Sequence, residues 1–236
     1  MQKKGNTLLV VLLLVVSFFA GYLFFKVKNL EQGKTLGTAQ QNQPTQTPQR
    51  PTELKIKKPE PNEHWRGDKN VRFVLVEYSD MECPFCKQFH PSMQKLLNDY
   101  GGKIAWVYRQ LPLPFHSKAQ KSAEATECAA DLGENDAFWK LLDLIFEKMP
   151  DMELSQLPSL ASEIGLDESS FSECLDSGKF EKKVKDQLAE GEKAQVQATP
   201  TSVIYDLKTG KTKLVEGAVP YESLKQSLDD FMTQNK

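Results

Sequence analysis

The feature that most constrains this chain is a pair of cysteines two residues apart, Cys83-Pro84-Phe85-Cys86. The run 71–78 before it is dense in β-branched and aromatic residues, which is typical of a strand buried on both faces. After it, apolar residues recur at helical spacing as far as Tyr100. A second β-rich run, 104–108, follows. The sequence therefore predicts a strand, a helix and a parallel strand, with the dithiol where the first strand gives way to the helix.

The middle of the chain is helical, and its end returns to β structure. Helical periodicity covers five segments, namely 117–132, 136–149, 157–164, 168–175 and 180–195. Two short β runs, 202–205 and 213–215, flank a turn at Thr209-Gly210 and predict an antiparallel hairpin. Pro220 then opens a last helix, because proline suits a first helical turn. The predicted fold class is therefore α/β with an α-helical insertion.

The N-terminal segment predicts a membrane anchor. From Thr7 to Phe25 the chain has 19 residues without a charge, and a helix of that length nearly spans a hydrocarbon core of roughly 30 Å. A cleaved signal peptide is the alternative, but its apolar region usually has only about 7–15 residues. The sequence favours an uncleaved transmembrane helix within residues 1–30. The flanking lysines give a weak preference for a cytoplasmic N-terminus.

Composition separates this anchor from a folded domain. Residues 31–62 are rich in Gln, Thr, Pro and Lys without an apolar period, so they predict a flexible linker to a domain over residues 63–236.

Charge is nearly balanced, with 30 Lys and Arg against 32 Asp and Glu. A nucleic-acid-binding protein would normally show a strongly basic face. Composition therefore gives no support for a nucleic-acid partner.

The spacing of the dithiol predicts redox chemistry. Two intervening residues at a helix start let the sulfurs meet in a short bridge, with Cys86 one turn further in than Cys83. Free backbone N–H groups and the positive end of the helix dipole stabilise a thiolate at Cys83. We expect Cys83 to attack and Cys86 to resolve the mixed disulfide. Pro84 suits the first helical position, and Phe85 adds bulk without charge.

Two other uses of the motif remain open. A structural zinc site wants four ligands in two close pairs, but Cys128 and Cys174 stand far apart and only His90 lies near Cys86. A purely structural disulfide is the second alternative, although so short a loop gains little stability when it is closed. Redox chemistry is favoured, and it requires neither a metal nor a bound organic cofactor.

Five stretches of the chain carry a family resemblance. They are His64-Trp65-Arg66-Gly67, 74–86, 109–116, Ala198-Thr199-Pro200-Thr201 and 216–221. In content and order they resemble the DsbA-like thiol:disulfide oxidoreductases, over roughly residues 62–233. The resemblance implies a thioredoxin-like fold with an inserted α-helical subdomain at about residues 115–196, in a membrane-anchored member of the family.

The resemblance also implies roles for residues outside the motif. Thr199-Pro200 would form a cis-proline loop facing the dithiol, with Thr199 offering backbone groups to an extended substrate chain. Glu77 would be a buried acid that relays the proton of Cys86, and an acid satisfied by hydrogen bonds at the strand end is the alternative. Lys87 and His90 are expected on a solvated helix face rather than as electrostatic partners of the thiolate. His116 is expected to cap or pack rather than to catalyse.

The other two cysteines, Cys128 and Cys174, fall in predicted inserted helices. A bridge between them would close a loop of about 47 residues and stabilise the fold by up to roughly 4 kcal/mol. Counting cannot pair four cysteines, but the resemblance implies this structural disulfide. Two buried free thiols and a relay role are the alternatives.

Together these predictions describe a single-pass membrane protein of a bacterium with an extracytoplasmic thiol:disulfide oxidoreductase domain. The resemblance implies that it introduces disulfides into folding secreted proteins. It also implies reoxidation by a quinone-linked membrane oxidase of the DsbB or vitamin K epoxide reductase type. A disulfide isomerase or reductase that is kept reduced is the alternative. A peptide-binding chaperone module is a more distant one, and its activity would survive Cys83→Ala.

Overall fold

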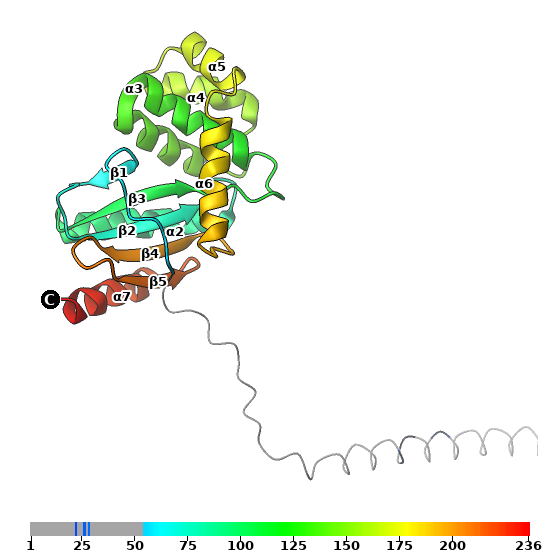
Figure 1. Cartoon of the computed structure of the whole chain (residues 1–236). Helices are drawn as coiled ribbons and strands as arrows, with labels where there is room; N and C mark the ends of the chain where they lie inside the picture. The colour runs from blue at the N-terminus through cyan, green and yellow to red at the C-terminus, as the bar shows by residue number, and fades with distance from the viewer. Residues whose placement is uncertain (1–21, 23–25, 27, 29–53) are drawn as a thin grey trace, which may run out of the picture. The chain divides into compact units, whose positions relative to one another are not determined.

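The computed structural model describes Tyr22, Lys26, Lys28 and residues 54–236, and Figure 1 shows the fold. Within that part of the chain, no helix is long and apolar enough to cross a membrane. The rest of the predicted anchor lies outside the described residues, as does the predicted linker as far as residue 53.

The last part of the predicted linker belongs to the folded domain. Leu54 is buried in an apolar cluster, and its carbonyl accepts a hydrogen bond of 3.1 Å from the Thr212 hydroxyl. The carbonyl of Lys57 accepts one of 2.9 Å from Arg109 Nη2. The predicted boundary at residue 62 is therefore too late, because a single buried leucine in a polar segment produces no periodicity.

Five strands of the described region form one mixed sheet. They are β1 (His64–Gly67), β2 (Phe73–Ser79), β3 (Ile104–Gln110), β4 (Thr201–Asp206) and β5 (Thr212–Glu216). The strand order is β1-β3-β2-β4-β5, in which β2 and β3 are parallel and the other neighbours antiparallel. The predicted parallel pair and the predicted hairpin of β4 with β5 are confirmed. The sequence does not predict β1, because four residues are too few for a periodicity.

Helices pack on both faces of the sheet and extend beyond it (Figure 1). They are α2 (Pro84–Tyr100), α3 (Ala119–Lys148), α4 (Leu157–Glu163), α5 (Glu168–Asp176), α6 (Glu181–Lys193) and α7 (Tyr221–Gln234), with the 3₁₀ turn η1 (Leu154–Gln156). The run from α3 to α6 lies between β3 and β4 in sequence, which confirms the predicted helical insertion. Within α3, the backbone at Gly133 and Glu134 is not helical, at the break that separates two predicted helical segments.

The central strand β2 is buried on both faces, as its apolar sequence predicts. Leu75 belongs to the larger apolar cluster, which includes Phe89 of α2 and Leu228 of α7. Val76 and Tyr78 belong to the cluster on the opposite face. Because side chains alternate along a strand, successive residues of β2 pack into one apolar cluster and then the other. The strand therefore holds the elements that pack on its two faces in fixed positions.

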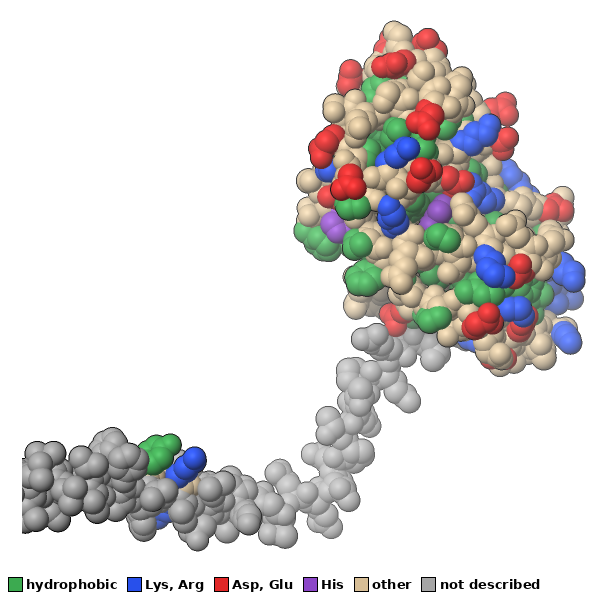
Figure 2. All heavy atoms as spheres, turned by 180° about the vertical axis from the view of Figure 1, so that it is seen from behind, with side chains coloured by type: hydrophobic (Ala, Val, Ile, Leu, Met, Phe, Trp, Pro, Cys, Tyr) green, Lys and Arg blue, Asp and Glu red, His purple; other side chains and the backbone are tan. Residues whose placement is uncertain are grey.

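Charged side chains of both signs are mixed on the molecular surface. In the view of Figure 2, both Lys or Arg and Asp or Glu side chains lie on the described domain, and Lys and Arg do not cover the face. The formal net charge of the whole chain is -2. The face in Figure 2 therefore lacks the basic field that nucleic-acid binding requires.

A disulfide closes the insertion. Cys128 of α3 and Cys174 of α5 are bonded, with their Cα atoms 5.9 Å apart and a sequence separation of 46. This is the pairing that the family resemblance implies. It ties α5, a helix of 9 residues, to the long helix α3.

Replacing both cysteines, Cys128→Ala together with Cys174→Ala, is expected to lower the free energy of unfolding by about 3–4 kcal/mol, because the unfolded chain regains the entropy of a long loop. Denaturant unfolding of the full chain measures the change. The reaction of the dithiol at Cys83 and Cys86 with glutathione serves as the control. It should be unchanged, because the substitutions leave both of those sulfurs in place. A loss below about 1 kcal/mol would contradict a stabilising role for the bridge.

Candidate active site

The dithiol lies at the junction of β2 and α2. Cys83 is the N-cap residue of α2 in an extended backbone conformation, and Pro84 occupies the first helical turn. The start of the helix is positioned by its buried face, which includes Phe89 and Met93. Cys83 therefore lies at the N-terminus of α2, where free backbone N–H groups and the helix dipole favour negative charge.

The two sulfurs differ in exposure and in acidity. Both are free thiols; Cys83 is 5% exposed and Cys86 is 0% exposed. The pKa of Cys83 falls from its ordinary 9.0 to about 5, because the Cys86 thiol donates to its thiolate and the backbone N–H groups of Phe85 and Cys86 add to this against the cost of burial. Burial, followed by the neighbouring Cys83, raises the pKa of Cys86 well above its ordinary value. Cys83 is thus the more accessible and more acidic sulfur, and Cys86 is held as a thiol.

The Thr199-Pro200 segment faces the dithiol. Its peptide bond is cis, and the Thr199 carbonyl oxygen lies 3.5 Å from Cys83 Sγ. The sheet register explains the approach, because Thr201 at the start of β4 is opposite Tyr78 near the end of β2. Residues more than a hundred positions apart thus meet at the sulfur.

Glu77 lies beneath the dithiol on the central strand. It is fully buried, and β-sheet pairing places it opposite Tyr108 on one side and Ser202 on the other. Neither carboxyl oxygen has a hydrogen-bond partner in the described part of the chain; Ser79 and Trp106 are near enough to lower its pKa only in part. Burial raises the pKa of Glu77 to about 7, and its charge in turn raises the pKa of Cys86. An acid satisfied by hydrogen bonds, the alternative reading of Glu77, does not match this environment.

Lys87 and His90 are not on a solvated helix face, so that prediction is wrong. His90 is buried, and its Nε2 lies 2.7 Å from Asp143 Oδ1 on α3. Lys87 Nζ donates to the Glu147 carbonyl at 3.0 Å and also to the Met149 carbonyl. The helical insertion covers this side of α2, which a helical pattern alone does not reveal.

Sequence reasoning also missed Asp80 and Glu82, which lie between β2 and the dithiol. Asp80 is buried, and its Oδ2 lies 2.8 Å from His116 Nδ1. Glu82 accepts a hydrogen bond of 2.5 Å from the backbone N–H of Lys118. His116 thus has a packing role, as expected. Acidic residues just after a strand are a weak signal of such backbone contacts, because they also occur in ordinary turns.

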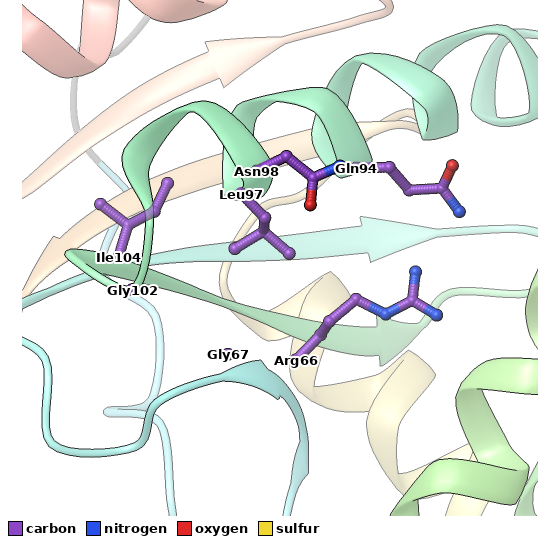
Figure 3. A pocket seen from close by; sticks show the side chains of 7 residues that line it. All are labelled: Arg66, Gly67, Gln94, Leu97, Asn98, Gly102 and Ile104. Atoms are coloured by element: carbon purple, nitrogen blue, oxygen red, sulfur yellow. The ribbon is translucent and has the colours of Figure 1, made fainter.

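A hollow of about 460 Å³ lies at the far end of α2 from the dithiol (Figure 3). The α2 side chains that line it are Gln94, Leu97 and Asn98, opposite Arg66 of β1. The Arg66 guanidinium is already bonded to Asp143, with Nη2 and Oδ2 2.6 Å apart. This hollow is therefore not the site of the thiol chemistry. Among the described residues, no group of three His, Cys, Asp or Glu side chains is placed to hold a metal ion.

Comparison with known proteins agrees with this geometry. The family model described as thioredoxin matches residues 59–230. The crystal structure of Pseudomonas aeruginosa DsbA2 is 27% identical, with a TM-score of 0.56 over 74% of this chain and 97% of that one. Oxidised BdbD from Bacillus subtilis is 24% identical, with a TM-score of 0.65 over 76% of this chain and 98% of that one, which supports the fold.

Curated relatives match over a shorter stretch. The Na(+)/H(+) antiporter NhaA 3 of Salinispora tropica is 34% identical over 140 residues, which make up 59% of this chain and 21% of the antiporter. The match thus spans about a fifth of that protein, and we infer no transport function from it. The family match and the paired cysteines at the start of α2 carry the assignment. The chain belongs to the thioredoxin family and is a DsbA-like thiol:disulfide oxidoreductase.

Proposed function

We propose that this chain is an oxidase that introduces disulfides into secreted proteins. The observation that carries the proposal is the position of Cys83 at the N-cap of α2, where the Cys86 thiol and the first-turn N–H groups lower its pKa to about 5 and make it a thiolate at neutral pH. A stabilised thiolate favours the reduced form of the dithiol, so the oxidised form is a strong acceptor of electrons. A reductase needs a dithiol whose thiolate is less stabilised, so that its reduced form gives up electrons readily.

The reaction balances over two exchanges. A substrate thiolate attacks Cys83 Sγ of the oxidised form, the Cys83–Cys86 bond breaks, and Cys86 leaves as a thiolate. A second substrate thiolate then attacks the substrate sulfur of the mixed disulfide and releases the Cys83 thiolate. The substrate gains a disulfide, and the dithiol gains the two electrons. Because Cys86 is buried and its pKa is raised, its thiolate needs a proton, which Glu77 is placed to supply.

The proposal places this reaction outside the cytoplasm. The apolar run of residues 7–25 would anchor the chain as a single transmembrane helix, with residues 63–236 on the outer side of a bacterial membrane. The bonded Cys128 and Cys174 support an oxidising compartment, since structural disulfides persist there. The reduced dithiol would be reoxidised by a quinone-linked membrane oxidase of the DsbB or vitamin K epoxide reductase type.

Equilibration of the full chain with mixtures of reduced and oxidised glutathione tests the direction of electron flow. We expect a reduction potential above about −200 mV, as in oxidising members of the fold. Quenching and mass measurement of trapped thiols give the reduced fraction. A potential near the roughly −270 mV of thioredoxin would contradict the oxidase and favour a reductase.

The acidity of Cys83 also predicts how stability depends on pH. Its pKa is about 5 in the folded reduced protein and 9.0 ordinarily, so between these values the unfolded chain binds more protons. The contribution of Cys83 to the unfolding free energy of the reduced form should therefore rise from pH 5 towards pH 9, and it is lost as pH falls through 5. Glu77, whose pKa is raised from 4.5 to about 7, contributes the opposite slope between those values in both redox forms, so the difference between the reduced and oxidised forms isolates Cys83. Cys86 stays protonated in the folded protein, so it opposes the gain from Cys83 only near pH 9, where the unfolded thiol loses its proton.

Denaturant unfolding of the reduced and oxidised forms across this range makes the measurement. The oxidised form is the internal control, because its Cys83 does not titrate. Reduced Cys83→Ser should lose the pH-dependent gain. A difference between reduced and oxidised stability that stays constant from pH 5 to pH 9 would rule out the depressed pKa.

Replacing the buried acid, Glu77→Gln, is expected to slow the first exchange on the order of 10²-fold at neutral pH, because the departing Cys86 loses its proton donor. Rapid mixing of the oxidised chain with a peptide dithiol, followed by acid quench, reports this step. Glu124→Gln is the matched control, since Glu124 is a buried acid of α3 whose Oε2 is bonded to Lys121 at 2.6 Å. Equal rates for Glu77→Gln and the unmodified chain would remove Glu77 from the mechanism.

A further inference from the structure

The carboxylate of Asp80 binds two segments together immediately before the dithiol. Its Oδ1 accepts a hydrogen bond of 2.8 Å from the backbone N–H of Glu82. Its Oδ2 accepts one of 2.7 Å from the backbone N–H of Leu113 and lies 2.8 Å from His116 Nδ1. Asp80 is only 1% exposed, and its own N–H lies 3.5 Å from Cys86 Sγ. One buried side chain thus contacts both the dithiol turn and the segment that follows β3.

That segment, residues 111–118, is held at both ends. The Leu111 N–H donates to the Ser79 carbonyl at 2.8 Å, and the Lys118 N–H donates to Glu82 Oε2 at 2.5 Å. Lys118 Nζ in turn donates to the Met152 carbonyl at 2.7 Å, in the insertion. We call residues 111–118 the clamped loop, since its contacts fix it to the residues that precede Cys83.

The clamped loop exposes a phenylalanine. Phe115 is 76% exposed, and Phe85 of the dithiol motif is 59% exposed. Among the described residues, the other large apolar side chains with comparable exposure are Tyr22 and Leu132. An exposed aromatic ring on a fixed loop is a contact surface that loses little conformational entropy when it binds.

The recessed position of Cys83 indicates which molecule contacts Phe85 and the clamped loop. Its side chain is 5% exposed, so an attacking sulfur must come close and bring its neighbouring residues over the rim of the site. Phe85 lies in that rim, within the motif itself, and the clamped loop is bonded to the residues just before it. The loop that carries Phe115 is thus fixed to the two acidic residues immediately before the sulfur with which the substrate thiol must react.

We propose that Phe115 is a specificity-determining residue and that Asp80 is the positioning residue that holds it beside Cys83. The occupant is the substrate polypeptide, and it carries a large apolar side chain next to its reactive cysteine. The inference rests on the proposed function, because the occupant is the chain whose thiol attacks Cys83. Substrates with such a side chain bind more tightly, because contact with it removes part of the Phe115 ring from water.

Two peptides with paired cysteines test the proposal when they are identical except for Leu or Ser beside the first cysteine. The measured quantity is the ratio of their rate constants for reaction with the oxidised full-length chain. The unmodified chain should prefer the Leu peptide, and Phe115→Ala should reduce that preference about tenfold, mainly through KM. Phe115→Tyr should preserve it, because the ring remains.

Asp80→Asn should lower the same ratio although Phe115 is present, because an amide cannot serve all the donors that the carboxylate serves. A merely structural defect would slow both peptides equally and leave the ratio unchanged. Leu132→Ala is the matched control, since it removes a 40% exposed apolar side chain from α3 in the insertion. The ratio for Leu132→Ala should equal that of the unmodified chain.

The inference is overturned if Phe115→Ala slows both peptides by the same factor, leaves both rates unaltered, or gives the same ratio as Leu132→Ala. Failure of the proposed function gives a different result. In that case the oxidised chain oxidises neither peptide, while the reduced chain cleaves their disulfide forms. The preference for Leu over Ser is then measured in that reduction, where the same loss in Phe115→Ala supports the role of Phe115.

Discussion

The rest of the site depends on the stabilisation of one thiolate, at Cys83. The hydrogen bond from Cys86 and the N–H groups of the first turn of α2 lower its pKa, while burial opposes them. Burial raises the pKa of Cys86 as well, and because no comparable set of donors offsets it there, Cys86 stays protonated. Two cysteines with two residues between them thus give one acidic, more accessible sulfur and one buried sulfur that is held as a thiol. The redox direction and the proton transfer that we propose rest on this difference.

The sheet register brings the other participants to that sulfur. β2 is paired with β3 and β4, so Glu77, Tyr108 and Ser202 share one row, and the cis Thr199-Pro200 segment follows directly from the position of β4. A shift of one residue in either pairing would turn Glu77 to the opposite face of the sheet, away from Cys86. The apolar side chains on both faces of β2 prevent such a shift. Core packing therefore positions the buried acid.

The sequence predicts the local features well and the long-range ones only through resemblance. The dithiol, the strand before it and the helix after it follow from spacing and periodicity, because each is formed by neighbouring residues. The contact of His90 with Asp143 joins positions 53 apart, and that of Asp80 with His116 joins positions 36 apart. No periodicity reports such pairs, so His90 was predicted as solvated and Asp80 was not predicted at all. Only the family resemblance drew attention to Thr199-Pro200 and to the Cys128–Cys174 pair.

The helical insertion does more than cover the sheet, because it holds the dithiol helix along one side. Lys87 donates to carbonyls at the end of α3, and His90 contacts Asp143, which Arg66 also binds from β1. These contacts lie on the first two turns of α2, next to the sulfurs, and the disulfide attaches α5 to the same long helix. The hydrogen bond from His90 and the partly exposed ion pair with Arg66 add little net stability, but they fix the position of Asp143 relative to α2, because a displaced side chain loses its partner. The insertion thus contributes to the chemistry by fixing where α2 begins.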